Sequence, residues 1–346
     1  MKNIKYFLQF ILVILFFFVF KILGIKLASN LSGKIFQIIG PLFRSKKLIY
    51  SNIKKAFPNI SQNELKEIYI SMWNNYGRVF AEYMFIKKFR HDRLNDNIIV
   101  SGREILENIK LNKQRVVFIS GHFSNFELMA MQIEKMGIKV AAIYRPLNNI
   151  FLNKIMEKIR RDHICKFQIK KGIGGTKELV KLIKDGFSTA LMIDQRVSEG
   201  IHSNFFNEKA STTTIPAQLV KKYRIPVVPI FIERFDGIKF KMTINKPINF
   251  EESKSVGEIT NELNKLLENI KNESIEKNIQ KKELIEHLKV DKKKQLNFDS
   301  KRKLEDQIAE TKLFKERREV QIIIALIQDR INSIWKKPSL GNKNIQ

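Results

Sequence analysis

The chain has 346 residues, enough for one large domain or two and for a sizeable core. Its 63 Lys and Arg against 35 Asp and Glu give a net charge of +28, which indicates a negatively charged partner: nucleic acid, anionic lipid, a phosphorylated substrate or an acidic carrier protein. The single cysteine, Cys165, excludes an intramolecular disulfide framework and a cysteine metal cluster, and its apolar neighbours favour a small buried residue in a strand.

The first 25 residues are strongly apolar. From Tyr6 to Phe20 the chain is almost wholly hydrophobic, Lys21 interrupts it, and residues 22–25 resume it. A membrane-spanning helix needs roughly 17 to 25 such residues, so this run is near the lower limit. A cleaved signal peptide is the alternative, but lysines intervene before the small residues Ala28-Ser29. We therefore expect residues 1–27 to be a retained membrane anchor.

Basic residues flank the predicted anchor on both sides, with two before the apolar run and more after it: Lys2, Lys5, Lys21, Lys26, Lys34, Arg44, Lys46 and Lys47. The positive-inside rule then places the main domain on the cytoplasmic side of the membrane. The anchor favours anionic membrane lipids as the partner and argues against nucleic acid. Residues 40–57 mix basic and apolar side chains, as an interfacial helix or an ordinary amphipathic helix on the core would.

The next part of the chain is predicted to be helical, and then strands alternate with helices. Within residues 30–95 an apolar stripe is most simply core: Trp73, Tyr76, Phe80 and Met84. Between about 98 and 250 we predict strands at 116–120, 139–144, 166–169, 189–193, 227–233 and 239–244, and helices at 150–161, 176–184 and 215–223. This alternation predicts an α/β fold with a mostly parallel sheet flanked by helices.

The last part of the chain changes in composition. Residues 271–318 carry dense Lys and Glu with few apolar residues, which predicts an exposed helix or partial disorder. Residues 320–335 are apolar enough to dock on the core or on the membrane surface. We therefore divide the chain into an anchor (1–27), a globular domain (28–270) and a charged helical or partly disordered tail (271–346).

One segment combines the features of a catalytic site: Gly121-His-Phe-Ser-Asn-Phe-Glu127, which follows a β-branched run and precedes a helical pattern. Residues five apart on one continuous helix lie roughly 500° around the axis, on different faces. A turn before the helix removes that obstacle, so Glu127 can accept a ring N–H from His122. An imidazole oriented by a carboxylate can take a proton from a substrate hydroxyl, which makes His122 a candidate general base.

A structural interpretation of the same segment is equally available. Ser124 and Glu127 have the spacing of a capping box, and Phe123 and Leu128 stand at the positions of a hydrophobic staple. The spacing of a histidine and an acid five residues on also occurs a second time, at His91 and Asp96. That stretch is polar and has no preceding strand, so we predict a surface loop there and prefer His122 as the base.

Polar residues also follow two other predicted strands. Arg145 comes directly after the strand at 139–144, and Asp194 after the strand at 189–193. Ligands of open α/β sheets bind at the carboxyl ends of the strands, so His122, Arg145 and Asp194 are expected to form one site. The alternatives are a surface ion pair for Arg145 and a turn residue for Asp194.

Several blocks along the chain, taken in order, resemble the late acyltransferases of lipid A biosynthesis, the lauroyl and myristoyl transferases. The blocks are Tyr50-Ser-Asn-Ile-Lys-Lys-Ala-Phe-Pro58, Trp73-Asn-Asn-Tyr-Gly-Arg78 with Glu82, Gly121 to Glu127, Tyr144-Arg-Pro-Leu-Asn-Asn149, Asp194-Gln195, Asn204-Phe-Phe206, Ser211-Thr-Thr-Thr214 and Pro226 to Arg234. The similarity covers roughly residues 1 to 270. It departs from the family at Asn207, where a glycine is usual, and at the tail, where the family usually ends in tryptophan, histidine and arginine residues.

The resemblance implies a glycerolipid-acyltransferase-like domain at residues 28–270, on the inner (cytoplasmic) membrane as a single-pass or monotopic protein. It implies transfer of a fatty acyl chain from acyl carrier protein to a hydroxyl of a glucosamine-based glycolipid, without a cofactor or a metal because the thioester is already activated. The roles that it implies are general base for His122 with Glu127 as partner, and substrate binding for Asn125, Arg145, Asp194 and Gln195. The same chemistry on another lipid acceptor, or a catalytically silent membrane scaffold, are the competing hypotheses.

Overall fold

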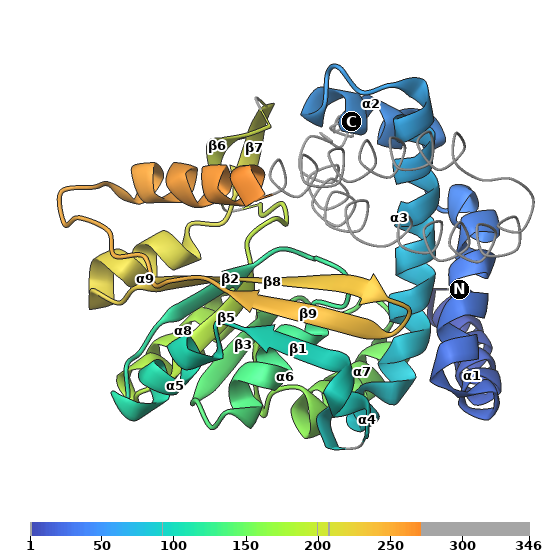
Figure 1. The fold of residues 1–346 in the computed structure, drawn as a ribbon, viewed down its shortest axis with the longest axis horizontal. Coiled ribbons are helices and arrows are strands. Elements are labelled where there is room, and N and C mark those ends of the chain that lie inside the picture. The colour runs from blue at the N-terminus through green and yellow to red at the C-terminus, as the bar shows by residue number, and fades with distance from the viewer. Residues whose placement is uncertain (1, 92, 199, 207, 271–346) are drawn as a thin grey trace, which may run out of the picture.

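A seven-stranded sheet forms the centre of the computed structural model of this chain (Figure 1). The structure describes residues 2–270 apart from positions 92, 199 and 207. The predicted charged tail, residues 271–346, and the apolar segment 320–335 within it lie outside the described residues.

The strand order in the sheet is β1-β9-β8-β2-β5-β3-β4. The strands are β1 (Ile98–Ser101), β2 (Val117–Ser120), β3 (Val140–Tyr144), β4 (Phe167–Lys170), β5 (Ser188–Met192), β8 (Val227–Asp236) and β9 (Lys239–Ile244). Neighbouring strands run parallel except β8 and β9, which pair antiparallel. The predicted α/β class and mostly parallel sheet are therefore confirmed.

All six predicted strands are present, whereas β1 and a hairpin formed by β6 (Ile201–Phe205) and β7 (Glu208–Thr212) were missed. The hairpin strands are short and mostly polar, with alternate residues exposed, so they lack the continuous apolar run by which the central strands are recognised. β1 is an edge strand in which only Ile98 is buried.

Two apolar cores cover the two faces of the sheet, because successive residues of a strand point to opposite faces. Phe118 of β2 joins the core beneath α5 (Arg103–Leu111) and α6 (Glu127–Lys135). Val117 and Ile119 join the core beneath α8 (Ile173–Lys184), α9 (Ile215–Tyr223) and a helix over residues 256–270. Figure 1 shows α5 and α6 on one side of the sheet and α9 on the other. The predicted helix at 150–161 is α7 (Ile150–His163).

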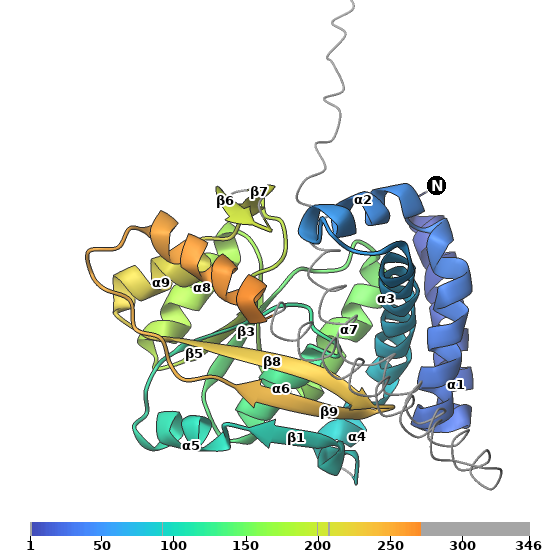
Figure 2. The same cartoon turned by 45° about the horizontal axis from the view of Figure 1, so that its top comes forward.

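The N-terminal part of the chain forms α1 (Lys2–Ile39), a short turn η1 (Gly40–Leu42), α2 (Lys46–Ala56) and α3 (Gln62–Glu82). Figures 1 and 2 show α1 lying beside α3 along the edge of the domain. The two helices approach closely at Gly77, where an added Cβ would lie 2.2 Å from the backbone oxygen of Ser32. α1 continues past the predicted anchor boundary at residue 27, with one non-helical residue at Gly24 (φ 72°).

The predicted apolar stripe packs against the core, with Trp73 buried and Tyr76, Phe80 and Met84 half-buried. Trp73 packs in a cluster with Ile49 and Ile53 of α2. Phe80 contacts Phe17 of α1, with a ring centroid distance of 5.2 Å. α2 buries Ile49 and Ile53 against α3, while Leu42 and Phe43 before it are 84% and 73% exposed, so both alternatives for residues 40–57 stay predictions.

Candidate active site

The register of the sheet brings His122 and Asp194 together. β2 and β5 are parallel neighbours, and Ser120 at the end of β2 is the Cα partner of Met192 at the end of β5. His122 and Asp194 each follow their strand by two residues, so they emerge side by side at the carboxyl edge of the sheet. β3, which precedes Arg145, is the next neighbour of β5. The three predicted strand-end residues therefore lie at one edge.

Asp194 holds His122 at two points. Its Oδ1 lies 2.8 Å from the ring Nδ1, and its Oδ2 accepts a hydrogen bond of 2.7 Å from the backbone N–H of His122. The Asp194 side chain is fully buried and the His122 side chain is 18% exposed. A carboxylate at Nδ1 favours the tautomer with the proton on that nitrogen, which leaves Nε2 as an acceptor. The Nε2 of Gln195 lies 3.1 Å from it and is in position to donate.

His122 opens into a cavity of about 450 Å³. The polar side chains around it include Glu127, Arg145, Arg160 and Gln195. Part of the apolar wall comes from the sheet, from α6 and from the residue after α7: Met129, Ala130, Ala142, Ile164, Ala190 and Met192. A cavity with one acid–base group near a polar rim and an apolar wall has the character of a small-molecule or lipid site.

Glu127 contributes to the same cavity in a different way from the predicted one. Its Oε1 accepts hydrogen bonds from Arg160 at 2.5 Å (Nη2) and 3.0 Å (Nε). Both side chains are largely buried, at 8% and 12% exposure. Burial lowers the pKa of the Arg160 guanidinium, but the charge and hydrogen bonds of Glu127, together with Tyr83 and Tyr144, more than offset burial and raise that pKa above its ordinary value. From the sequence we expected Glu127 to contact Nδ1 of His122. In the structure Asp194 makes that contact.

The predicted capping box is wrong. α6 begins at Glu127 with Phe126 at the N-cap, and no side chain caps that end. Ser124 adopts a left-handed conformation with φ 48°, so the chain turns sharply before the helix instead of entering it in the extended form that a capping residue needs. The turn predicted after Gly121 is present, and its geometry frees Glu127 to face Arg160.

No sequence pattern indicates Arg160 as a site residue, although its helix was predicted. Residues 158–163 contain three cations and a histidine in succession, Lys158, Arg160, Arg161 and His163. Lys158 instead pairs with Asp162 on the exposed surface. Only the way α7 packs against α6 selects the residue that turns inward, so no pattern along the chain marks Arg160.

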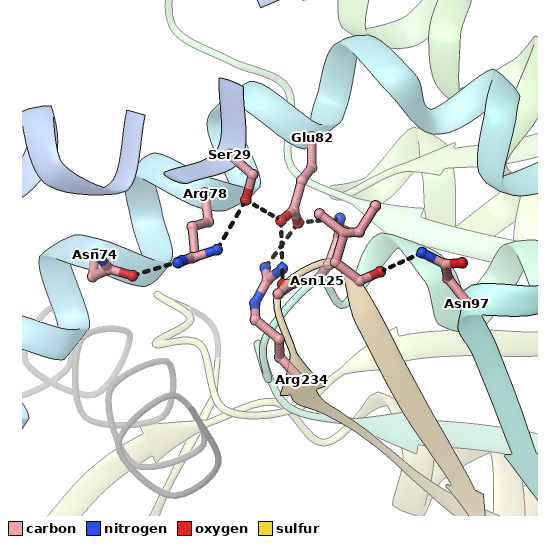
Figure 3. Close-up of polar contacts among 9 residues, drawn as sticks. Ser29, Asn74, Arg78, Glu82, Asn97, Asn125 and Arg234 are labelled. Atoms are coloured by element: carbon pink, nitrogen blue, oxygen red, sulfur yellow. Dashed lines mark hydrogen bonds and ion pairs between the residues drawn. The ribbon is translucent and has the colours of Figure 1, made fainter. Parts of the chain in front are cut away.

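Asn125 lies in a buried charged network behind the cavity (Figure 3). Its Nδ2 donates to Oε2 of Glu82 at 3.1 Å. The same carboxylate pairs with the guanidinium of Arg234 and accepts from the hydroxyl of Ser29 at 2.8 Å. The network therefore joins α1, α3, β8 and the loop that carries His122. Contact of Asn125 with substrate stays a prediction.

The second histidine motif is located elsewhere. His91 ends the short helix α4 (Ile86–His91), and Asp96 lies in the turn η3 (Arg93–Asn97). Both side chains are exposed, and the ring of His91 lies 6.1 Å from that of His163. The predicted loop is thus helical, and its surface position agrees with the preference for His122.

A family model and several known proteins are similar to this chain over more than half of its length. Residues 1–279 match the family described as bacterial lipid A biosynthesis acyltransferase. The lipid A biosynthesis myristoyltransferase of Escherichia coli (strain K12) is 25% identical over 215 residues, which cover 61% of this chain and 65% of the relative. Lipid A biosynthesis acyltransferase 1 of Shigella flexneri has the same identity and coverage.

A third relative, lipid A biosynthesis acyltransferase 2 of Shigella flexneri, is 23% identical over 217 residues, 61% of this chain and 68% of the relative. The chain thus spans 65% of the length of the first two relatives. The family match covers most of the chain and includes every site residue described above. The chain belongs to the bacterial lipid A biosynthesis acyltransferase family.

Proposed function

We propose that this protein is a membrane-bound O-acyltransferase that moves a fatty acyl group from acyl carrier protein to a hydroxyl of a glucosamine-based lipid A precursor. The observation that carries the proposal is the His122–Asp194 pair opening into a cavity with an apolar wall. Family membership supports the same reaction class. The high positive charge of the chain suits an acidic carrier protein and a phosphorylated acceptor.

In this mechanism His122 is the general base. Nε2 takes the proton of the acceptor hydroxyl while that oxygen attacks the carbonyl carbon of the thioester. The tetrahedral intermediate then collapses, the C–S bond breaks, and the departing thiolate takes the proton back from Nε2. The acceptor hydroxyl displaces the amide of Gln195, which lies at the same nitrogen. Asp194 keeps the ring oriented and stabilises the imidazolium that forms.

The negative charge that develops on the thioester oxygen is stabilised by N–H donors or by a positive group nearby. Arg160 supplies one, since it lines the cavity and is held in place by Glu127. In this proposal Glu127 acts on the reaction through Arg160. Arg145 is exposed at the rim of the cavity and suits a phosphate group of the acceptor, to which a guanidinium binds in a bidentate manner.

A direct assay tests the proposed donor and acceptor. Purified protein is incubated with acyl-loaded carrier protein and a panel of acceptors: a lipid A precursor, glycerol phosphate and a second glycolipid. We expect acyl transfer to the lipid A precursor, detected by mass spectrometry. Transfer to glycerol phosphate alone would overturn the lipid A acceptor. Absence of transfer to every acceptor by folded protein would instead favour the membrane scaffold.

The apolar wall of the cavity provides a place for the acyl chain. Ala142 of β3 and Ala190 of β5 are Cα partners, so their side chains lie side by side on one face of the sheet. Ala130 of α6 lines the cavity opposite them, with Ile164 beyond the end of α7. Small side chains on both surfaces leave the space that a hydrocarbon chain would fill.

The variant Ala142→Leu should shift the chain-length preference. We expect the ratio of kcat/KM for a long acyl chain to that for a chain about four carbons shorter to fall roughly tenfold or more, because each excluded methylene costs about 1 to 3 kcal/mol. Activity with the short chain should stay within a few-fold of wild type. The control Ala56→Leu, in α2, should leave the ratio unchanged. An unaltered ratio in Ala142→Leu would place the acyl chain elsewhere.

A further inference from the structure

We propose that α1 lies in the plane of the membrane surface, with one apolar face in lipid, and does not cross the bilayer. Both of its ends then stay on the side of the catalytic domain. The proposal concerns how the chain sits on a membrane and stands independently of the reaction proposed above.

One side of α1 is occupied by the protein along its whole length. Near the N-terminus, Asn149 of the loop before α7 donates to the backbone oxygen of Tyr6 at 2.8 Å. Phe7 packs edge-on against Phe151 with centroids 5.6 Å apart. Further along, Phe20 is buried against α3, and Ser29 bonds to Glu82. A helix that crossed the bilayer alone would have lipid on this side.

The opposite side of α1 is an exposed apolar stripe. Before the break at Gly24, nine large apolar side chains are 41% to 70% exposed and recur at helical spacing: Ile4, Phe7, Leu8, Ile11, Leu12, Leu15, Phe18, Val19 and Ile22. At about 100° per residue they cover one face of the helix. Such a stripe, lying opposite a docked face, is the pattern of an interfacial helix. The membrane covers the face that the protein leaves open.

The lysines of α1 fit this orientation. Lys5 and Lys21 fall roughly 100° from the centre of the stripe, on opposite sides, where long side chains reach the headgroup layer from a helix in the plane. Between them, Tyr6 to Phe20 amount to about 22 Å of helix, less than the ~30 Å hydrocarbon thickness. A spanning α1 would therefore draw Lys5 or Lys21 into the bilayer.

Charge identifies the lipid that this surface prefers. Residues 1–63 contain ten cations, all lysines except Arg44, and the first acidic residue is Glu64. A surface that combines an apolar stripe with cations and lacks carboxylates is complementary to anionic headgroups. A second copy of this chain would present like charges to it. We therefore assign the stripe to an anionic lipid surface.

The proposed membrane face continues to the cavity. The loop from Arg145 to Asn148 lines the cavity, and the next residue, Asn149, contacts α1. Leu147 and Ile150, on either side of that contact, are 39% and 51% exposed. If the proposed function holds, a lipid acceptor enters the cavity from the same leaflet in which α1 lies.

Single-cysteine labelling distinguishes an in-plane helix from a spanning one. The native thiol of Cys165 is a suitable background, because it is fully buried and burial raises its pKa to about 12. Asn3→Cys and Ser45→Cys report on the two ends of α1. In sealed inverted vesicles we expect a membrane-impermeant maleimide to label both thiols, and in intact spheroplasts neither. Labelling of the Asn3→Cys thiol from the opposite side to the Ser45→Cys thiol would overturn the proposal.

A second measurement tests the occupant of the stripe. The double variant Leu8→Glu/Leu15→Glu should bind vesicles of phosphatidylethanolamine and phosphatidylglycerol at least tenfold more weakly in flotation, since each leucine loses its burial in lipid. The control Asn112→Glu/Gln114→Glu adds the same charge at exposed positions after α5, away from the stripe, and should bind as wild type does. Unchanged vesicle binding would overturn the proposal, as would loss of self-association with vesicle binding retained.

Discussion

The variant His122→Ala is expected to transfer acyl groups about 10²- to 10⁴-fold more slowly than wild type, the range that a positioned general base contributes. Nε2 of His122 is the acceptor that opens into the cavity, and Asp194 holds the ring from behind. Without the ring, the acceptor hydroxyl loses the group that takes its proton. The measurement is the single-turnover rate of acyl transfer from loaded carrier protein.

A loss of activity must be separated from a loss of structure. Asp194 is fully buried and accepts two hydrogen bonds from His122, one of them from the backbone N–H, which the alanine variant keeps. His122→Gln also restores a side-chain donor but has no basic nitrogen, so we expect it to melt near wild type and to stay inactive. His91→Ala should retain nearly full activity. If His91→Ala lost activity and His122→Ala kept it, the proposed site would be wrong.

The variant Glu82→Gln is expected to destabilise the fold by about 3 to 5 kcal/mol, the cost of leaving a buried charge without its partner. Glu82 and Arg234 are both 0% exposed, and the two guanidinium nitrogens face the two carboxylate oxygens. Ser29 and Asn125 each donate a further hydrogen bond to the carboxylate of Glu82 (Figure 3). Neutralising Glu82 leaves the charge of Arg234 in the interior, where water cannot solvate it.

Thermal unfolding in detergent, followed by circular dichroism, measures this loss. The matched control is Glu107→Gln, which removes a surface pair with Arg103 whose side chains are 52% and 68% exposed. It should cost less than about 0.5 kcal/mol, as exposed helix pairs do. The double variant Glu82→Gln/Arg234→Met removes both charges and should recover much of the stability. Equal melting of Glu82→Gln and Glu107→Gln would show that the buried pair is not structural.

The central strands and the strand-end residues were predictable because they depend on local pattern and on one general rule. A strand buried on both faces is mostly apolar, so β2, β3, β5 and β8 are recognised as apolar runs along the chain. Parallel strands end at a common edge, so residues after those runs converge. His122, Arg145 and Asp194 were found in this way, and the register of β2 with β5 explains why two of them touch.

The partners of the charged groups were not predictable in the same way. Arg160 meets Glu127 across 33 residues of chain, and Arg234 meets Glu82 across 152. Each contact depends on the packing of elements that are distant in sequence, and lysines and arginines occur throughout this chain. The left-handed conformation of Ser124 likewise cannot be predicted from the spacing of Ser124 and Glu127. Because of that conformation the predicted capping box does not form.

The sequence by itself determined the fold class, the family resemblance and the position of His122 at the carboxyl edge of the sheet, because apolar periodicity and strand-end position are properties of short segments. Tertiary structure alone decided that Asp194 orients His122, that Glu127 holds Arg160, and that one face of α1 is docked on the domain. A carboxylate pairs with whichever cation or imidazole the packing of helices and strands brings within hydrogen-bond distance. The sequence does not give that distance, so only the tertiary structure shows these pairs.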